Sequence, residues 1–293
     1  MRIREAAAMP DLDLACRVAV DAAEAAGALL RAGTRRAVDS RVKDSTGDVV
    51  TDLDLAAEQM IVGRIRTAFP AHRIIAEESG LLDAGDHACT WLVDPLDGTN
   101  NVAIGLPAFV VGIALCAGNL PVLGVVHDPV AQQTWSAVRH GGALGPGGGR
   151  LRPPFRPAPY GPVLAWTQGH GVARDDGTAT ALKLVLQSTA RRVLQMWAPL
   201  LSWVMLARGD IDGIIGYQAE AIDLHAGSLI AIEAGIAVCG LDGNPFDERI
   251  DLPDQDRSFI AGHRDNVERL VGLVAAAERI RPAVCALDAT ADW

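Results

Sequence analysis

Long apolar runs, paired cysteines and a surplus of basic charge are all missing from this sequence, and each absence excludes a class of protein. No apolar run is long enough to span a bilayer, and the N-terminus lacks the basic and apolar regions of a signal peptide. The five cysteines are odd in number and form no C-x-x-C pair, which argues against a zinc cluster or a disulfide framework. We therefore expect a protein of the reducing cytoplasm that has no membrane partner.

Acidic residues outnumber basic ones, 36 to 26, and the net charge is −10. This balance argues against a nucleic acid polymer or an anionic membrane as the main partner. A small phosphorylated metabolite stays possible, because bound divalent cations would reverse the sign of the local charge. With 49% hydrophobic residues in 293, the chain can bury a sizeable core.

The first part of the chain carries helical patterns followed by a succession of strands. Apolar residues recur at helical spacing over 11–33 and again over 51–69. Runs typical of β-strands follow one another at 108–118, 121–127 and 133–139. They predict an antiparallel meander packed against the two helices.

The later part of the chain alternates between strand and helix. Strands are expected at 163–167, 192–196, 211–217, 236–239 and 258–261, and helices at 179–187, 200–207, 223–235 and 266–277. The alternation indicates a layered α/β half. The glycine- and proline-rich segment 140–162 predicts a flexible loop between an N-terminal α+β half, 1–145, and a C-terminal α/β half, 146–293.

The stretch WLVDPLDGTNN at 91–101 concentrates residues with chemical function. Asp94 and Asp97 lie three residues apart on a kinked strand end, where their carboxylates can converge as the hard oxygen ligands that Mg²⁺ prefers. Gly98 and Thr99 follow, and can present N–H groups and a hydroxyl to a phosphate at a helix start. The stretch therefore predicts a site for a metal and a phosphate.

Other acids belong to the same constellation. Glu77 directly follows a predicted strand at 73–76, Asp223 opens a predicted helix, and Asp54 lies early in the helix at 51–69. Carboxylates brought together would repel and raise one another's pKa unless a cation neutralised them. Divalent ions resolve that conflict and can activate a water for hydrolysis of a phosphate ester.

Four segments resemble the inositol monophosphatase family in their order and spacing. These segments are DVVTDLD at 48–54, IAEES at 75–79, DPLDGTNN at 94–101 and DLHAG at 223–227. The resemblance covers nearly the whole chain, since 122–129 also matches. It implies an α/β (α+β) fold, a layered α-β-α-β-α sandwich of the inositol monophosphatase and fructose-bisphosphatase type, and a homodimer.

The resemblance also implies the metal ligands. Glu77, Asp94 and the carbonyl of Leu96 would hold one Mg²⁺. Asp94, Asp97 and Asp223 would hold a second, so that Asp94 bridges the two. Glu77 would have a catalytic role as well, by orienting a third, loosely held ion through water, and Mn²⁺ is a possible substitute for Mg²⁺.

Roles for the remaining residues follow from the same resemblance. Thr99, paired with Asp54, would position the attacking water. The N–H groups of Gly98 and Thr99 would bind the phosphate, and Asp223 would also contact the substrate. Lys43 would lie in a loop that closes near the metals.

The chain departs from the family pattern where the leaving group would bind. Gly216 stands where the inositol-cleaving members have a glutamate, Ile222 replaces a tryptophan, and 194–199 replace a Gly-Ser or Gly-Thr pair. We therefore predict a phosphoric monoester hydrolase for a sugar, cyclitol or nucleotide monophosphate, with myo-inositol phosphate disfavoured as the substrate. A nucleotidase of the 3′-phosphoadenosine 5′-phosphate type is the alternative, followed by a non-catalytic dimeric binding protein with the same fold.

Several residues have two readings. His225 either lines the pocket or packs in the interior, and His170 is expected to be structural. Trp197 and Trp203, placed on an apolar helix, favour core or dimer contacts over a platform for the substrate. The arginine pair at 191–192 is either a solvated pair or reaches a second phosphate.

Overall fold

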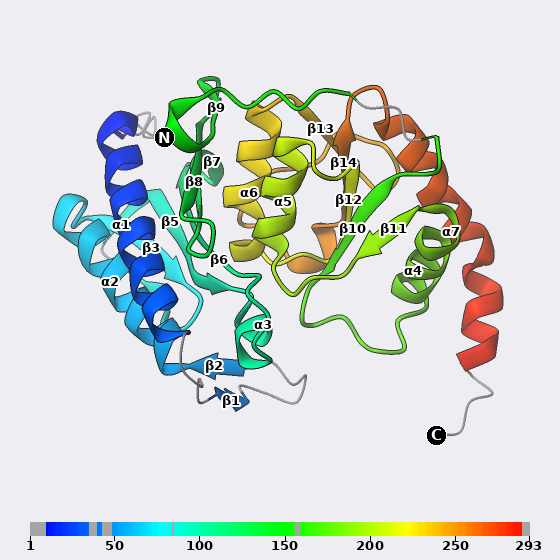
Figure 1. Ribbon diagram of the computed structural model, residues 1–293, viewed down its shortest axis with the longest axis horizontal. Helices are drawn as coiled ribbons and strands as arrows, with labels where there is room; N and C mark the ends of the chain where they lie inside the picture. The colour runs from blue at the N-terminus through cyan, green and yellow to red at the C-terminus, as the bar shows by residue number, and fades with distance from the viewer. Residues whose placement is uncertain (1–9, 35–39, 43–48, 84, 156–158, 289–293) are drawn as a thin grey trace, which may run out of the picture.

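Helices and sheets alternate in five layers across the molecule (Figure 1). The computed structural model describes residues 10–34, 40–42, 49–83, 85–155 and 159–288. A helix pair covers a seven-stranded sheet, a second pair lies between that sheet and a five-stranded one, and a third pair covers the far side. This is the α-β-α-β-α sandwich that the sequence led us to expect.

The helices occupy three of these layers. They are α1 (Leu12–Gly33) and α2 (Asp52–Ala68) outside the first sheet, α5 (Pro199–Arg208) and α6 (Ile222–Glu233) between the sheets, α4 (Gly177–Thr189) and α7 (Val267–Asp288) outside the second sheet, and the short α3 (Thr99–Ala103). Each interface between a helix pair and a sheet is filled by a hydrophobic cluster. Within the described part of the chain, the helices are too short or too polar to cross a membrane.

The strands form two large sheets and one small one. In spatial order, the first sheet contains β4 (Gly80–Leu82), β3 (His72–Ala76), β5 (Asp86–Asp97), β6 (Val110–Ala117), β7 (Leu120–Asp128), β8 (Gln133–Val138) and β9 (Gly142–Leu144). The second contains β11 (Arg192–Leu194), β10 (Val163–Gln168), β12 (Gly213–Tyr217), β14 (Phe259–His263) and β13 (Ile236–Gly240). A hairpin-like pair is made by β1 (Ser40–Val42) and β2 (Val49–Thr51).

The predicted meander is confirmed, because β6, β7 and β8 pair antiparallel in succession. The loop predicted over 140–162 is wrong in part. Gly142–Leu144 forms β9 and pairs with β8, since Ala143 is buried in the core of the sheet, and a 3₁₀ turn follows at Pro146–Gly148. A second 3₁₀ turn lies at Asp254–Asp256.

Several element boundaries also differ from expectation. The last helix continues past 277 and through Pro282, because Val284 is buried in the cluster that α7 shares with α4. Strand β11 ends at Leu194 rather than at 196. The division into halves at 145 and 146 stays a prediction, although the middle cluster joins Leu92 of β5 to Trp203 of α5 and so belongs to both halves.

An irregularity at the end of β5 brings its two aspartates to one side. Asp94 pairs with Gly112 of β6 and Asp97 pairs with Val110, so three steps along β5 match two steps along β6. A regular strand would point residues three apart to opposite faces. The extra residue is a bulge, which restores the shared orientation of the two carboxylates.

Close contact between α6 and β7 sets the position of α6. A Cβ atom built on Gly124 of β7 would lie 2.5 Å from the carbonyl oxygen of Ala226 on α6. Glycine therefore allows the helix backbone to rest directly on the sheet. Because Asp223 lies one turn before Ala226, this contact also determines where its carboxylate sits.

Replacing Gly124 with Ala should separate these two layers. We expect the free energy of unfolding to fall by about 1–3 kcal/mol, as for other overpacked interiors, with weaker Mg²⁺-induced stabilisation because Asp223 is displaced. Urea denaturation with and without Mg²⁺ measures both effects. Gly63→Ala is the matched control, because its Cβ on α2 meets nothing within 4 Å, and it should stabilise the protein by about 0.5–1 kcal/mol. Equal stability of the two variants would contradict the prediction.

Candidate active site

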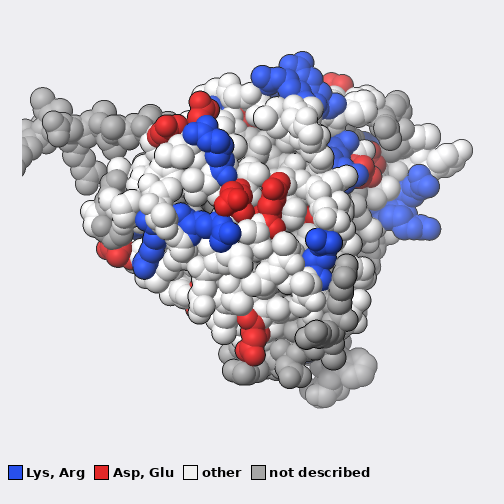
Figure 2. All heavy atoms as spheres, turned by 60° about the vertical axis from the view of Figure 1, so that its left-hand side comes forward, with Lys and Arg blue, Asp and Glu red and all other residues white. Residues whose placement is uncertain are grey.

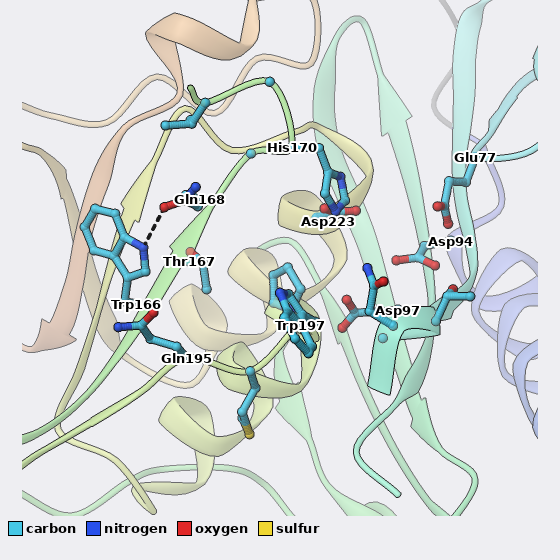
Figure 3. A pocket seen from close by; sticks show the side chains of 18 of the residues that line it. Glu77, Asp94, Asp97, Trp166, Thr167, Gln168, His170, Gln195, Trp197 and Asp223 are labelled. Carbon is cyan, nitrogen blue, oxygen red and sulfur yellow. Dashed lines mark hydrogen bonds between the residues drawn. The ribbon is translucent and has the colours of Figure 1, made fainter. Parts of the chain in front are cut away.

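A cavity of about 700 Å³ collects most of the residues that the sequence singled out (Figure 3). The predicted residues that line it are Glu77, Asp94, Leu96, Asp97, Gly98, Thr99 and Asp223. Asp54 lies just behind the wall, and Lys43 lies outside the residues that the structure describes. Residues separated by up to 146 positions (223 − 77) thus meet at one cavity.

Glu77 and Asp94 are neighbours because they lie at the carboxyl ends of adjacent parallel strands, Glu77 just after β3 and Asp94 near the end of β5. Ala76 of β3 pairs with Val93 of β5, and the N–H of Glu77 donates to the carbonyl of Val93 at 3.1 Å. Side chains that leave parallel strands at their carboxyl ends meet at the same sheet edge. The N–H of Leu96 donates to Asp94 Oδ1 at 3.0 Å and holds this carboxylate within the bulge.

Asp97 is held from the opposite layer. Its Oδ2 accepts from the N–H of Leu200 at 2.8 Å and from the N–H of Leu201 at 3.3 Å. Both donors belong to the first turn of α5, where backbone N–H groups have no partner within the helix. The first sheet and the middle helix layer are therefore joined at the site itself.

Asp223 completes a group of acids that repel one another. Burial raises the pKa of Asp94 well above its ordinary value, and the charges of Glu77, Asp97 and Asp223 raise it further. Burial also raises the pKa of Asp97, followed by the charge of Asp223. Such a set of oxygen donors is suited to a hard divalent cation, which would relieve the repulsion.

Asp54 and Thr99 form the pair that the sequence predicted. The Thr99 hydroxyl donates to Asp54 Oδ1 at 2.7 Å, and the carbonyl of Leu96 lies 3.0 Å from the same hydroxyl. Asp54 Oδ2 accepts from the backbone N–H of Thr51 at 2.9 Å and from its hydroxyl. Asp54 is therefore the third residue of a capping box at the start of α2, which orients its other oxygen toward Thr99.

Glu58 supports the site and was missed in the sequence. Its carboxylate is buried and accepts from the N–H of Glu78 at 2.7 Å, from the N–H of Ser79 at 3.0 Å and from the Ser79 hydroxyl. These bonds hold the turn that follows Glu77. The available signal was spacing, because Glu58 lies four residues after Asp54 and so shares its helix face.

The wall of the cavity opposite the acids was predicted only in part. Trp166, the segment 167–174 and Lys183 were missed, whereas Gln195 and Trp197 belong to the segment 194–199 that the sequence placed where the leaving group would bind. Trp197 is not a core residue, since 58% of its surface is exposed, and it precedes α5 rather than lying on it.

The other two-way readings are decided by burial. Trp203 is in the core, where it stacks on Phe259 with ring centroids 4.9 Å apart. His225 is fully buried and does not line the cavity. The arginine pair at 191–192 is exposed and lies outside the cavity lining, so among the residues that the structure describes, Arg174 and Lys183 are the lysine and arginine side chains that line the cavity.

A carboxylate and a histidine lie beside Asp223. Gly216 cannot carry a side chain, because a Cβ there would meet the Phe259 ring at 2.2 Å. Glu220 lies near the acids instead, and its Oε1 is 3.2 Å from His170 Nδ1. His170, expected to be structural, therefore lines the cavity, and one donor atom from each of His170, Glu220 and Asp223 lies within 4.8 Å of the others.

Comparison with known proteins shows the family of this chain. The model of the inositol monophosphatase family matches residues 11–279. The chain belongs to the inositol monophosphatase family. Among its relatives are a protein named Nus factor SuhB from Pasteurella multocida, 36% identical over 227 residues, and Inositol monophosphatase 1 from Solanum lycopersicum, 32% identical over 241 residues. The matches cover 77% and 78% of this chain and 85% of each relative.

Solved structures of the family share the fold. The extragenic suppressor protein suhB from Bartonella henselae superposes with a TM-score of 0.80 at 27% identity, over 89% of this chain and 98% of that one. The inositol monophosphatase from Anabaena gives 0.75 at 26% identity, over 91% and 97%. Dependence on Mg²⁺ is general in the family, and the acids described above form a fitting set of donors.

Asp94→Asn should raise the stability of the metal-free protein. Because the pKa of Asp94 is raised by folding, the folded chain holds a proton that the unfolded chain releases. Stability of the metal-free wild type therefore falls as pH rises from the ordinary range of aspartate through the raised pKa. The variant lacks this group, so its Tm in EDTA at neutral pH should be higher by a few degrees and should change less with pH. Scanning calorimetry between about pH 5 and pH 8 measures this, and equal Tm values at neutral pH would contradict it.

Glu58→Gln should weaken Mg²⁺ binding without removing a ligand. A glutamine keeps the size of Glu58 but has a single acceptor oxygen, so it cannot serve both Glu78 and Ser79. Loosening the turn beside Glu77 should lower the Mg²⁺ affinity roughly tenfold, as for other residues that orient ligands. Isothermal titration with Mg²⁺ measures the change. Glu278→Gln on the exposed face of α7 is the control, and an unchanged affinity in Glu58→Gln would show that the turn needs no such support.

Proposed function

We propose that this protein is a Mg²⁺-dependent phosphatase that hydrolyses a small phosphorylated metabolite. One observation carries the proposal: four carboxylates, one directly after β3, two on β5 and one on α6, line a single cavity next to the Asp54–Thr99 pair. Membership of the inositol monophosphatase family supports it.

Glu77, Asp94, Asp97, Asp223 and the carbonyl of Leu96 are the groups that would hold two or three Mg²⁺ ions, with Mn²⁺ as a possible substitute. When bound, these ions would neutralise the phosphoryl oxygens and lower the pKa of a water. The raised pKa of Asp94 supports this assignment, because it reflects burial and negative charge that a cation would offset.

Thr99 and Asp54 would orient the attacking water. The Thr99 hydroxyl donates its proton to Asp54 Oδ1 at 2.7 Å, so its oxygen lone pairs are left to accept a hydrogen bond from a water in the cavity. Asp54 itself is fully buried and acts through Thr99. We propose that the N–H groups of Gly98 and Thr99 bind the phosphate and that Asp223 contacts the substrate.

The substrate we propose is a sugar, cyclitol or nucleotide monophosphate. The relative from Solanum lycopersicum is named for inositol monophosphate, but the ring-contacting glutamate is missing here and packing against Phe259 leaves no space for it at Gly216. A nucleotidase of the 3′-phosphoadenosine 5′-phosphate type is the second candidate, favoured by the tryptophans in the cavity wall.

A non-catalytic binding protein is the third candidate. The relatives named Nus factor SuhB bear a name that states no hydrolytic activity. The complete set of acids in this chain favours hydrolysis, because uncompensated carboxylates around a cavity destabilise a fold that has no use for them. The homodimer and the cytoplasmic location stay predictions.

Phosphate release from a panel of phosphomonoesters tests the proposal. With Mg²⁺, we expect turnover of at least one among sugar phosphates, inositol phosphates, histidinol phosphate and nucleotides, and EDTA should stop it reversibly. Asp94→Asn should abolish it, because the variant lacks the proposed bridging carboxylate, while Glu278→Gln should keep wild-type activity. Failure of every compound, or near-normal kcat in Asp94→Asn, would overturn the proposal.

A further inference from the structure

Charges of opposite sign are separated along the cavity. The acids gather at one end, on the right of Figure 3, whereas Lys183 lies beside Trp166, on the left. Arg174 lines the same cavity. The outer surface differs, since Figure 2 shows acidic and basic side chains mixed in small groups on the face over α1 and α2. A phosphate bound at the acid end would not need cations elsewhere in the wall, so these cations call for a second negatively charged group.

Trp197 presents an aromatic surface between the two ends. In Figure 3 its ring lies between Asp97 and Trp166. The backbone next to it is fixed relative to the acids, because the N–H groups of Leu200 and Leu201 bind Asp97. An indole with this much exposed surface in a cavity wall contributes most to the free energy of binding when a flat ring stacks on it.

Lys183 lies at the far end, beside the buried ring of Trp166. Its Nζ is 5.6 Å from the Trp166 ring centroid, and the Trp166 N–H donates to Gln168 Oε1 at 3.1 Å, which fixes the ring. Partial burial lowers the pKa of Lys183, while the charge of Asp176 opposes that effect. A cation held away from bulk water attracts an anion more strongly than one on the surface.

We propose that the leaving group of the substrate carries a flat aromatic ring, which stacks on Trp197, and a second anionic group, which Lys183 and Arg174 bind. A nucleoside bisphosphate has this chemistry. A simple polyol phosphate matches these two features less well, because it has neither an aromatic ring nor a second negative charge. A cavity of about 700 Å³ is within the usual range for ligands of this size. That this ligand is a substrate rests on the proposed hydrolysis, whereas the binding site itself does not depend on it.

Protection of Lys183 from an amine-acylating reagent tests binding without turnover. Asp94→Asn protein with Mg²⁺ is labelled in the presence of adenosine 3′,5′-bisphosphate, adenosine 3′-monophosphate or inorganic phosphate, and the peptide containing Lys183 is quantified by mass spectrometry. We expect the bisphosphate to protect Lys183 at concentrations at least about tenfold below those of the other two, since a charged hydrogen bond is lost without the second anion. Equal protection by all three, or none, would overturn the proposal.

Kinetics with four substrates separate the contribution of the ring to KM from that of the second anion. These are a nucleoside bisphosphate, a nucleoside monophosphate, a sugar bisphosphate and a sugar monophosphate. Lys183→Met should reduce the KM advantage of the second anion roughly tenfold or more, and Trp197→Leu should reduce the advantage of the ring by a similar factor. Arg191→Gln, an exposed cation outside the cavity lining, should change neither ratio.

The two experiments distinguish this proposal from the proposed function. Phosphate release with no preference for the ring or the second anion would leave the phosphatase standing and overturn the binding site. Protection of Lys183 by the bisphosphate with no phosphate release would support the site and overturn the hydrolysis. Selective loss of the ring advantage in Trp197→Leu supports the site, and unchanged ratios in both variants overturn it.

Discussion

Mutual repulsion among the carboxylates at one cavity is the constraint on which the rest of the structure depends. Each acid is fixed by elements that are stable for other reasons: the parallel pairing of β3 and β5 for Glu77, the bulge for Asp94, and the first turn of α5 for Asp97. Backbone N–H groups are well suited to this, because they bind a carboxylate without adding a mobile charge. The mutually repelling carboxylates are therefore kept in place by packing in several layers rather than by one local motif.

That packing explains why so much of the chain is needed for so small a site. The middle hydrophobic cluster joins both sheets to α5 and α6, and close approach of α6 to β7 at Gly124 sets the depth of Asp223. Stability of the core thus offsets strain at the site, a common arrangement where function needs charges that folding disfavours. Glu58 plays the same part locally, by tying the turn after Glu77 to α2.

The two ends of the cavity are associated with different aspects of function. The acids and the Asp54–Thr99 pair belong to segments that this chain shares with its family, and they specify phosphate chemistry. The segment 194–199, which contains Trp197, departs from that pattern, so identities near 26 to 36% are informative about the reaction more than about the leaving group. A second departure is Gly216, where the ring of Phe259 on the neighbouring strand occupies the space that a side chain would need.

The sequence by itself determined most helices and strands, the meander and the acids at strand ends, because hydrophobic periodicity and turn residues act over a few neighbouring positions. The five-layer sandwich was implied by the family resemblance. The pairing of Asp54 with Thr99, 45 positions apart, was implied by the family resemblance, whereas the local capping box of Thr51 and Asp54 orients only Asp54. Only the tertiary structure decided that Trp197 and Lys183 face the cavity, that Trp203 does not, and that β9 extends the first sheet. These outcomes depend on how whole helices and strands pack against one another, and no short stretch of residues encodes that.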